Sequence, residues 1–77
     1  MGDFPTVKAR ELIAALRQAG FVVHNQVGSH VQLKHPLHPG KVTVPNHPGE
    51  DIRMGLLRSI LQQAGLTTEE LRLLLKK

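Results

Sequence analysis

Five histidines are the side chains of this sequence best suited to proton transfer, and His30 directly follows a glycine and a serine. An imidazole exchanges protons near neutral pH, so histidine often serves as a general acid or base. RNA cleavage needs such groups, because a base must take the ribose 2′-hydroxyl proton and an acid must protonate the departing oxygen. Gly28-Ser29-His30 is therefore a candidate catalytic segment, although an exposed strand position also needs a polar residue for structural reasons.

Three valine-rich segments with alternating polar and apolar residues predict the strands that would carry this histidine. The predicted strands are Phe21–Gln26, His30–His35 and Lys41–Pro45. Turn residues separate them, with Pro36–Gly40 between the second and the third. The short connections favour an antiparallel meander.

The length of the first hairpin loop decides which residues share a face of the sheet. A three-residue loop, Val27–Ser29, places Gln26 opposite His30, His24 opposite Gln32 and Val23 opposite Leu33, so that apolar meets apolar. A two-residue loop would pair Val27 with His30 and mix the faces, so we favour three. The expected core residues are Val23, Leu33, Val42 and Val44, and the expected polar face comprises His24, Gln26, His30, Gln32, Lys34 and Thr43.

Two amphipathic helices flank the predicted strands. Thr6 is the expected cap of the first, whose apolar residues Ala9, Leu12, Ile13 and Leu16 recur at helical spacing before Gly20. The second begins near Asp51–Gly55, carries Leu57, Ile60, Leu61 and Ala64, and stops at Gly65. Thr67–Glu70 is typical of a capping box that opens a short third helix. We therefore predict an α+β fold of order α-β-β-β-α(-α), a three-stranded antiparallel sheet with helices on one face, as a single domain over residues 1–77.

Composition narrows the classes of function. The sequence has no cysteine, which excludes disulfides and thiolate sites and suits a reducing cytoplasm. Its apolar runs are too short to span a membrane. A net charge of +4 favours an anionic partner, with nucleic acid as the first candidate. His35 and His38 lie at the proline-containing turn after the second predicted strand, and His47 lies in the next loop. No recognisable set of metal ligands accompanies them, so we expect no metal and no cofactor.

Several cations and a second imidazole could assist His30. Lys34 lies on the same predicted face and could offset charge on phosphorus. His24 is a possible second proton-transfer group, or simply a polar residue of the sheet. Arg10 and Arg17 share one stripe of the first helix and Arg58 lies on the second, where they could hold phosphates or be ordinary solvated charges.

Several motifs together resemble the HicA toxins, the small mRNA interferases of type II toxin-antitoxin systems. They are Gly28-Ser29-His30, His35-Pro36, Val42-Thr43-Val44-Pro45 and the run from Leu57 to Leu66. The resemblance implies a fold like that of double-stranded-RNA-binding domains, metal-independent cleavage of mRNA, and inhibition by a HicB-type antitoxin. It also implies that His30 is catalytic. Independently of the resemblance, Gly28 and Ser29 are candidate RNA contacts, because a ligand backbone can approach a glycine-containing loop closely. The sequence departs from the family pattern at Met54-Gly55-Leu56, where Pro-Gly-Thr is common.

Two other functions remain open from the residues. A non-catalytic RNA-binding module would use the same fold and charge without cleavage. An interaction protein would use the polar face of the sheet to bind only another protein.

Overall fold

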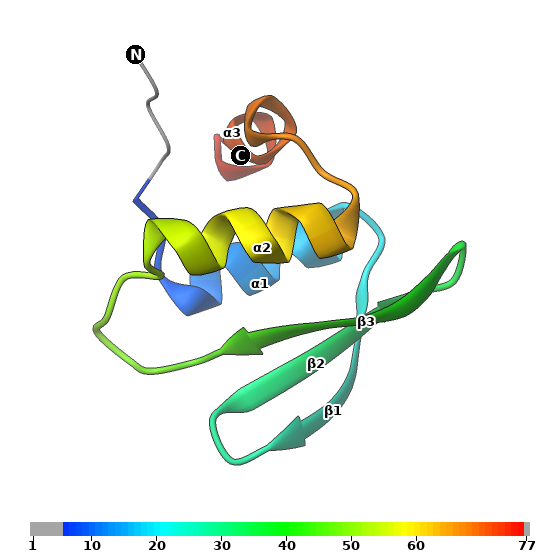
Figure 1. The fold of residues 1–77 in the computed structure, drawn as a ribbon, viewed down its shortest axis with the longest axis horizontal. Helices are drawn as coiled ribbons and strands as arrows, with labels where there is room; N and C mark the ends of the chain where they lie inside the picture. The colour runs from blue at the N-terminus through cyan, green and yellow to red at the C-terminus, as the bar shows by residue number, and fades with distance from the viewer. Residues whose placement is uncertain (1–5, 77) are drawn as a thin grey trace.

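A computed structural model describes residues 6–76 and contains three helices and three strands. In chain order these are α1 (Ala9–Gln18), β1 (Val22–Val27), β2 (His30–His35), β3 (His38–Pro45), α2 (Met54–Ala64) and α3 (Thr68–Leu75). The strands form one antiparallel sheet in the order β1-β2-β3. Figure 1 shows α1 and α2 on one side of the sheet and α3 beyond α2. The predicted α+β architecture is confirmed.

The core lies between the helices and the β2–β3 part of the sheet. Its largest fully buried side chains are Leu12, Leu16, Leu33, Leu57, Ile60, Leu71, Val7 and Val44. The apolar stripes of α1 and α2 recur every three or four residues, so each helix turns one face onto the sheet. Every buried residue among those described is apolar, and the polar side chains lie at or near the surface.

Helix α1 begins later than the sequence predicted. Its N-cap is Lys8, whose backbone N–H donates to Glu11 Oε1 at 2.9 Å, and the expected cap Thr6 lies two residues before it and exposed. The residues before α1 are extended because Val7 is buried and its carbonyl accepts a hydrogen bond from Ile52 N at 2.8 Å. This antiparallel contact holds the chain out of the helical conformation until Ala9.

The other predicted helix boundaries are confirmed. α1 and α2 both end before a glycine, and the apolar residue after that glycine bonds back to the last turn, Phe21 N to Leu16 O at 3.0 Å and Leu66 N to Leu61 O at 2.9 Å. In α3, Thr67 N donates to Glu70 Oε1 and Glu70 N donates to Thr67 Oγ1, which completes the predicted capping box.

The first hairpin differs from the predicted register. Val27 pairs with His30 across a two-residue turn, so the predicted pairs Gln26–His30 and His24–Gln32 are wrong. The predicted pair Val23–Leu33 is nevertheless present, because a bulge between Val23 and Asn25 takes up one residue. His24 is that extra residue.

Two further predictions about the sheet fail at its margins. Val23 was expected in the core but is 43% exposed, because β1 is an edge strand away from the helices (Figure 1). β3 begins at His38 instead of Lys41, because Pro36 and Leu37 alone form the turn after β2. The expected core residues Leu33, Val42 and Val44 are buried.

The end of α1 packs directly against the β2–β3 hairpin through His35. Its Nδ1 accepts a hydrogen bond from Leu37 N at 3.0 Å, so Nε2 carries the proton and donates to Ala19 O at 3.2 Å. The ring also contacts Phe21, with ring centroids 4.9 Å apart. Gly20 leaves the space for this ring: its φ is +105°, and a Cβ there would lie 2.6 Å from His35 Nε2.

We expect Gly20→Ala to destabilise the protein more than Gly40→Ala. Both glycines have positive φ, +105° and +86°, so alanine strains the backbone at each by roughly 1 to 3 kcal/mol. Only at Gly20 does the new methyl group also displace His35, since nothing lies within 4 Å of a Cβ at Gly40. The free energy of unfolding in denaturant measures the difference.

A double-mutant cycle isolates the steric part of this effect. In a His35→Ala background the additional cost of Gly20→Ala should disappear, leaving a loss like that of Gly40→Ala. An undiminished cost in that background would contradict the contact.

Candidate functional site

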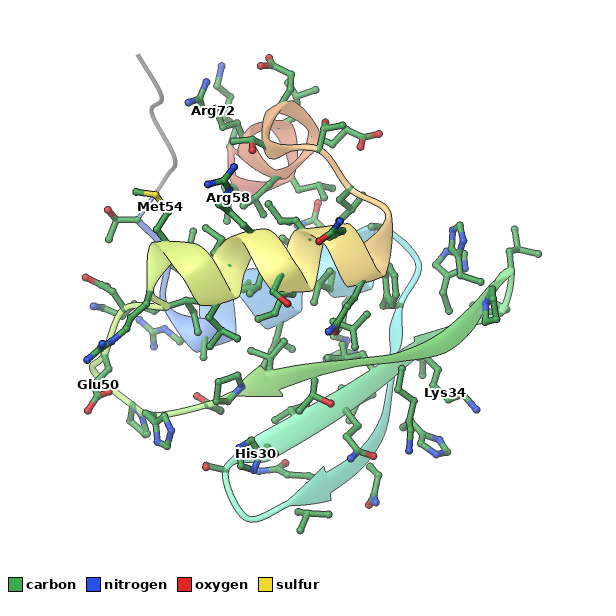
Figure 2. All side chains as sticks on the ribbon, in the orientation of Figure 1. His30, Lys34, Glu50, Met54, Arg58 and Arg72 are labelled. Carbon is green, nitrogen blue, oxygen red and sulfur yellow. The ribbon has the colours of Figure 1, made fainter. Side chains whose placement is uncertain are left out.

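His30 is the first residue of β2 and projects from the face of the sheet opposite the helices. Val31 and Leu33 are buried on the helix side, so the alternation of a strand places His30, Gln32 and Lys34 on the other face. His30 is exposed, and Figure 2 shows it near the end of the sheet where β1 ends and β2 begins. A ligand can therefore reach its imidazole.

The neighbours of His30 across the sheet are apolar. Val27 pairs with it from β1 and Pro45 from β3, and Val27 is 59% exposed. The three-residue loop expected from the sequence placed Gln26 beside His30 instead. Val27 and Pro45 were therefore missed as neighbours of the candidate catalytic residue. The two-residue turn is the reason. The glycine-serine pair was a signal for such a turn, but the matching of faces along a regular strand favoured a three-residue loop.

The backbone around His30 is held from both sides. The chain enters it from the turn Gly28-Ser29, where Gln26 Nε2 donates to Gly28 O at 3.2 Å. Asn46 N donates to Ser29 O at 2.6 Å, which extends the pairing of β2 and β3 past Pro45. A Cβ added to Gly28 would meet nothing within 4 Å, so the turn itself is open to a ligand.

Lys34 shares the face of His30 but lies toward the other end of β2 (Figure 2). Four residues of strand separate their Cα atoms by about 13 Å. His24, at the bulge of β1, lies level with Gln32 and Leu33 and is exposed. Neither Lys34 nor His24 lies directly opposite His30 on a neighbouring strand.

The three candidate arginines lie in different places. Arg10 is exposed in the first turn of α1 and lines a hollow that also includes Asn46, the residue bonded to Ser29. Arg17 lies seven residues further along α1, about 10.5 Å along its axis. Figure 2 shows Arg58 projecting from α2 on the side away from the sheet, toward Arg72. Among the described hollows, the one formed with the loop bonded to Ser29 is lined by Arg10 and not by Arg17 or Arg58.

The hollow near Arg10 has a volume of about 380 Å³ and lies between the start of α1 and the loop from β3 to α2. It is lined by Lys8, Ala9, Arg10, Asn46, His47, Pro48 and Gly49. Lys8 Nζ pairs with Asp51 Oδ1 at 2.9 Å and ties the two sides of the hollow together. His47 was missed as a site residue, because its place in a predicted loop suggested at most a metal ligand. Its position two residues after a strand that pairs with His30 was the available signal.

The remaining histidines lie apart from His30. His35 and His38 contact each other at the far end of the sheet, with ring centroids 4.5 Å apart, and both rings face Phe21. Across residues 6–76, no three His, Asp or Glu side chains are grouped so that they could hold a metal ion. None of the helices in that range is long and apolar enough to cross a membrane.

Comparison with known proteins agrees with the motifs. A family model described as the HicA toxin of bacterial toxin-antitoxin systems matches residues 9–66. No curated protein matches the chain. The matched span runs from α1 through α2 and includes His30, Arg10 and His47.

Proposed function

The chain belongs to the HicA family, the toxins of bacterial toxin-antitoxin systems, and from this premise we propose that it is a metal-independent endoribonuclease that cleaves mRNA. One observation carries the proposal. The histidine of Gly28-Ser29-His30 is exposed on the face of the sheet opposite the helices, beside an open turn, within the matched residues. A side chain placed in this way can reach an RNA backbone and exchange a proton with it.

His30 acts in this proposal as a general acid or base on the ribose 2′-hydroxyl or on the departing oxygen. The RNA passes over the turn, where Gly28 and Ser29 allow a close approach of its backbone. Lys34, Arg10, Arg17 and Arg58 are the proposed phosphate contacts, supported by their exposure and by the net charge of +4. Because Arg58 and Lys34 lie far from His30, they would hold parts of the RNA distant from the cleaved bond.

As a toxin of such a system, the protein has an antitoxin partner. We propose a HicB-type antitoxin that covers His30. An antitoxin can inhibit an exposed catalytic residue most simply by covering it. Acidic side chains on the antitoxin would complement the basic side chains of the toxin. The site of action is the cytoplasm, where mRNA is found.

His30→Ala should abolish cleavage without unfolding the protein. Loss of a general acid or base costs about a hundredfold to ten-thousandfold in rate. An exposed substitution shifts the free energy of unfolding by no more than about 0.5 kcal/mol. The assay follows a long single-stranded RNA in the presence of a chelator. His38→Ala is the matched control, because it removes an imidazole from the far end of the same sheet and should leave cleavage intact.

Two results would count against this prediction. Equal cleavage by the parent and by His30→Ala would remove His30 from the mechanism. Binding without any cleavage by the parent would favour a non-catalytic RNA-binding module.

Replacing one phosphate contact with alanine should weaken RNA binding similarly for all sequences. The slope of log affinity against log salt should become shallower by roughly one unit for each lost contact. Titrations of Lys34→Ala, Arg10→Ala, Arg17→Ala and Arg58→Ala at several salt concentrations measure this slope. An unchanged slope would show that the residue does not contact a phosphate.

In the complex with its antitoxin, His30 should be buried, and affinity should fall as salt rises. Protection of residues 28–32 from amide exchange in the complex would report the covered face. A complex that leaves this segment as accessible as in the free toxin contradicts the prediction. An affinity independent of salt would contradict its electrostatic part.

A further inference from the structure

A hollow lies between the start of α1 and the β3–α2 loop. Its volume, about 380 Å³, suits part of a nucleotide, and its lining includes Arg10 and His47. Both side chains are exposed at its margin, so a ligand can enter from solvent. Guanidinium groups recognise phosphate through paired hydrogen bonds.

Backbone pairing brings this hollow to the end of the sheet that carries His30. His30 pairs with Pro45, and the next residue of the loop, Asn46, donates to Ser29 O at 2.6 Å. His47 directly follows Asn46 and lines the hollow. The histidine on the loop is thus two residues from the strand partner of the histidine on β2.

The charges around the hollow differ between its two sides. Arg10 lies on one side. On the other side is a smaller hollow of about 180 Å³, which is also lined by His47 and includes Glu50, Asp51 and Arg53. Lys8 is paired with Asp51 and contributes less positive charge than Arg10. A phosphate is therefore favoured on the Arg10 side, with His47 between it and the carboxylates.

Resting on the proposed ribonuclease function, we propose that this hollow is the RNA subsite next to the cleaved phosphodiester. In it, Arg10 holds a phosphate and His47 provides the second imidazole of the reaction. One of the two imidazoles, that of His30 or His47, takes the 2′-hydroxyl proton while the 2′-oxygen forms its bond to phosphorus. The bond from phosphorus to the 5′-oxygen breaks, and that oxygen receives a proton from the other imidazole. The products are a 2′,3′-cyclic phosphate and a 5′-hydroxyl, and no metal or redox partner is needed.

His24 is the competing candidate for the second imidazole. It lies on β1 at the bulge, level with Gln32 and Leu33 of β2, and these residues are two and three positions along the strand from His30. His24 also lines no described hollow with a cation, whereas His47 shares one with Arg10. His24→Ala is thus a matched control for His47→Ala.

The first experiment compares cleavage of a long RNA by the full-length parent, His47→Ala, His47→Gln and His24→Ala. We expect both His47 variants to lose about a hundredfold to ten-thousandfold in rate and His24→Ala to stay close to the parent. All variants should still bind a 2′-O-methyl RNA, which lacks the attacking hydroxyl. Parental cleavage by His47→Ala, or recovery in His47→Gln, would overturn the proton-transfer role.

A substrate with sulfur in place of the departing 5′-oxygen separates the two roles. A thiolate leaves without a proton donor because it is the weaker base. This substrate should restore cleavage by one of His30→Ala and His47→Ala, and the restored variant identifies the acid. If neither or both are restored, the two imidazoles do not share the reaction in this way.

The subsite itself is tested by binding of a 2′-O-methyl trinucleotide. Arg10→Ala should weaken this binding and make its salt dependence shallower by about one unit. Lys41→Ala should not, because Lys41 is an exposed cation of β3 that lies four strand residues, about 13 Å, before Pro45. Equal effects of the two substitutions would overturn the subsite. Absence of RNA cleavage by the parent would instead overturn the proposed function, so the two failures are distinguishable.

Discussion

Burial of Val31 and Leu33 under the helices decides where the chemistry of this protein can lie. Side chains of a strand alternate between its two faces, so anchoring these two residues in the core forces His30, Gln32 and Lys34 to the opposite face. The core is small and entirely apolar, and it cannot accommodate a shift of β2 by one residue without exposing these side chains. The outward position of His30 is therefore a consequence of packing on the other side of the sheet.

The sequence was sufficient to predict features that repeat along the chain. Helical stripes such as the one through Leu57, Ile60 and Leu61, and the alternation in β2 and β3, follow from burial on one face and were read correctly. Glycine helix stops and the Thr67 capping box are local, so they too could be recognised. The α+β order followed from these elements.

The exact length of a turn and the exact start of a helix could not be predicted in this way. The choice between a two- and a three-residue hairpin turn rested on matching faces along a strand assumed to be regular. The bulge at His24 makes the shorter turn compatible with the Val23–Leu33 pair, so both patterns are satisfied in different halves of β1. The start of α1 depends on Val7 pairing with Ile52, 45 residues away, which no local pattern records. A different pairing places His47 at the end of the sheet that carries His30, because β3 pairs with β2 as far as Pro45 and Asn46 N donates to Ser29 O.

The two edges of the sheet differ in how readily they could accept another strand. β3 carries Pro39 and Pro45, which lack the N–H that a new strand would need, whereas β1 has no proline. Val22 and Val27 on β1 are 60% and 59% exposed and favour extended structure. Addition of a strand from another molecule is therefore favoured at the β1 edge, and Val22→Lys would disfavour it.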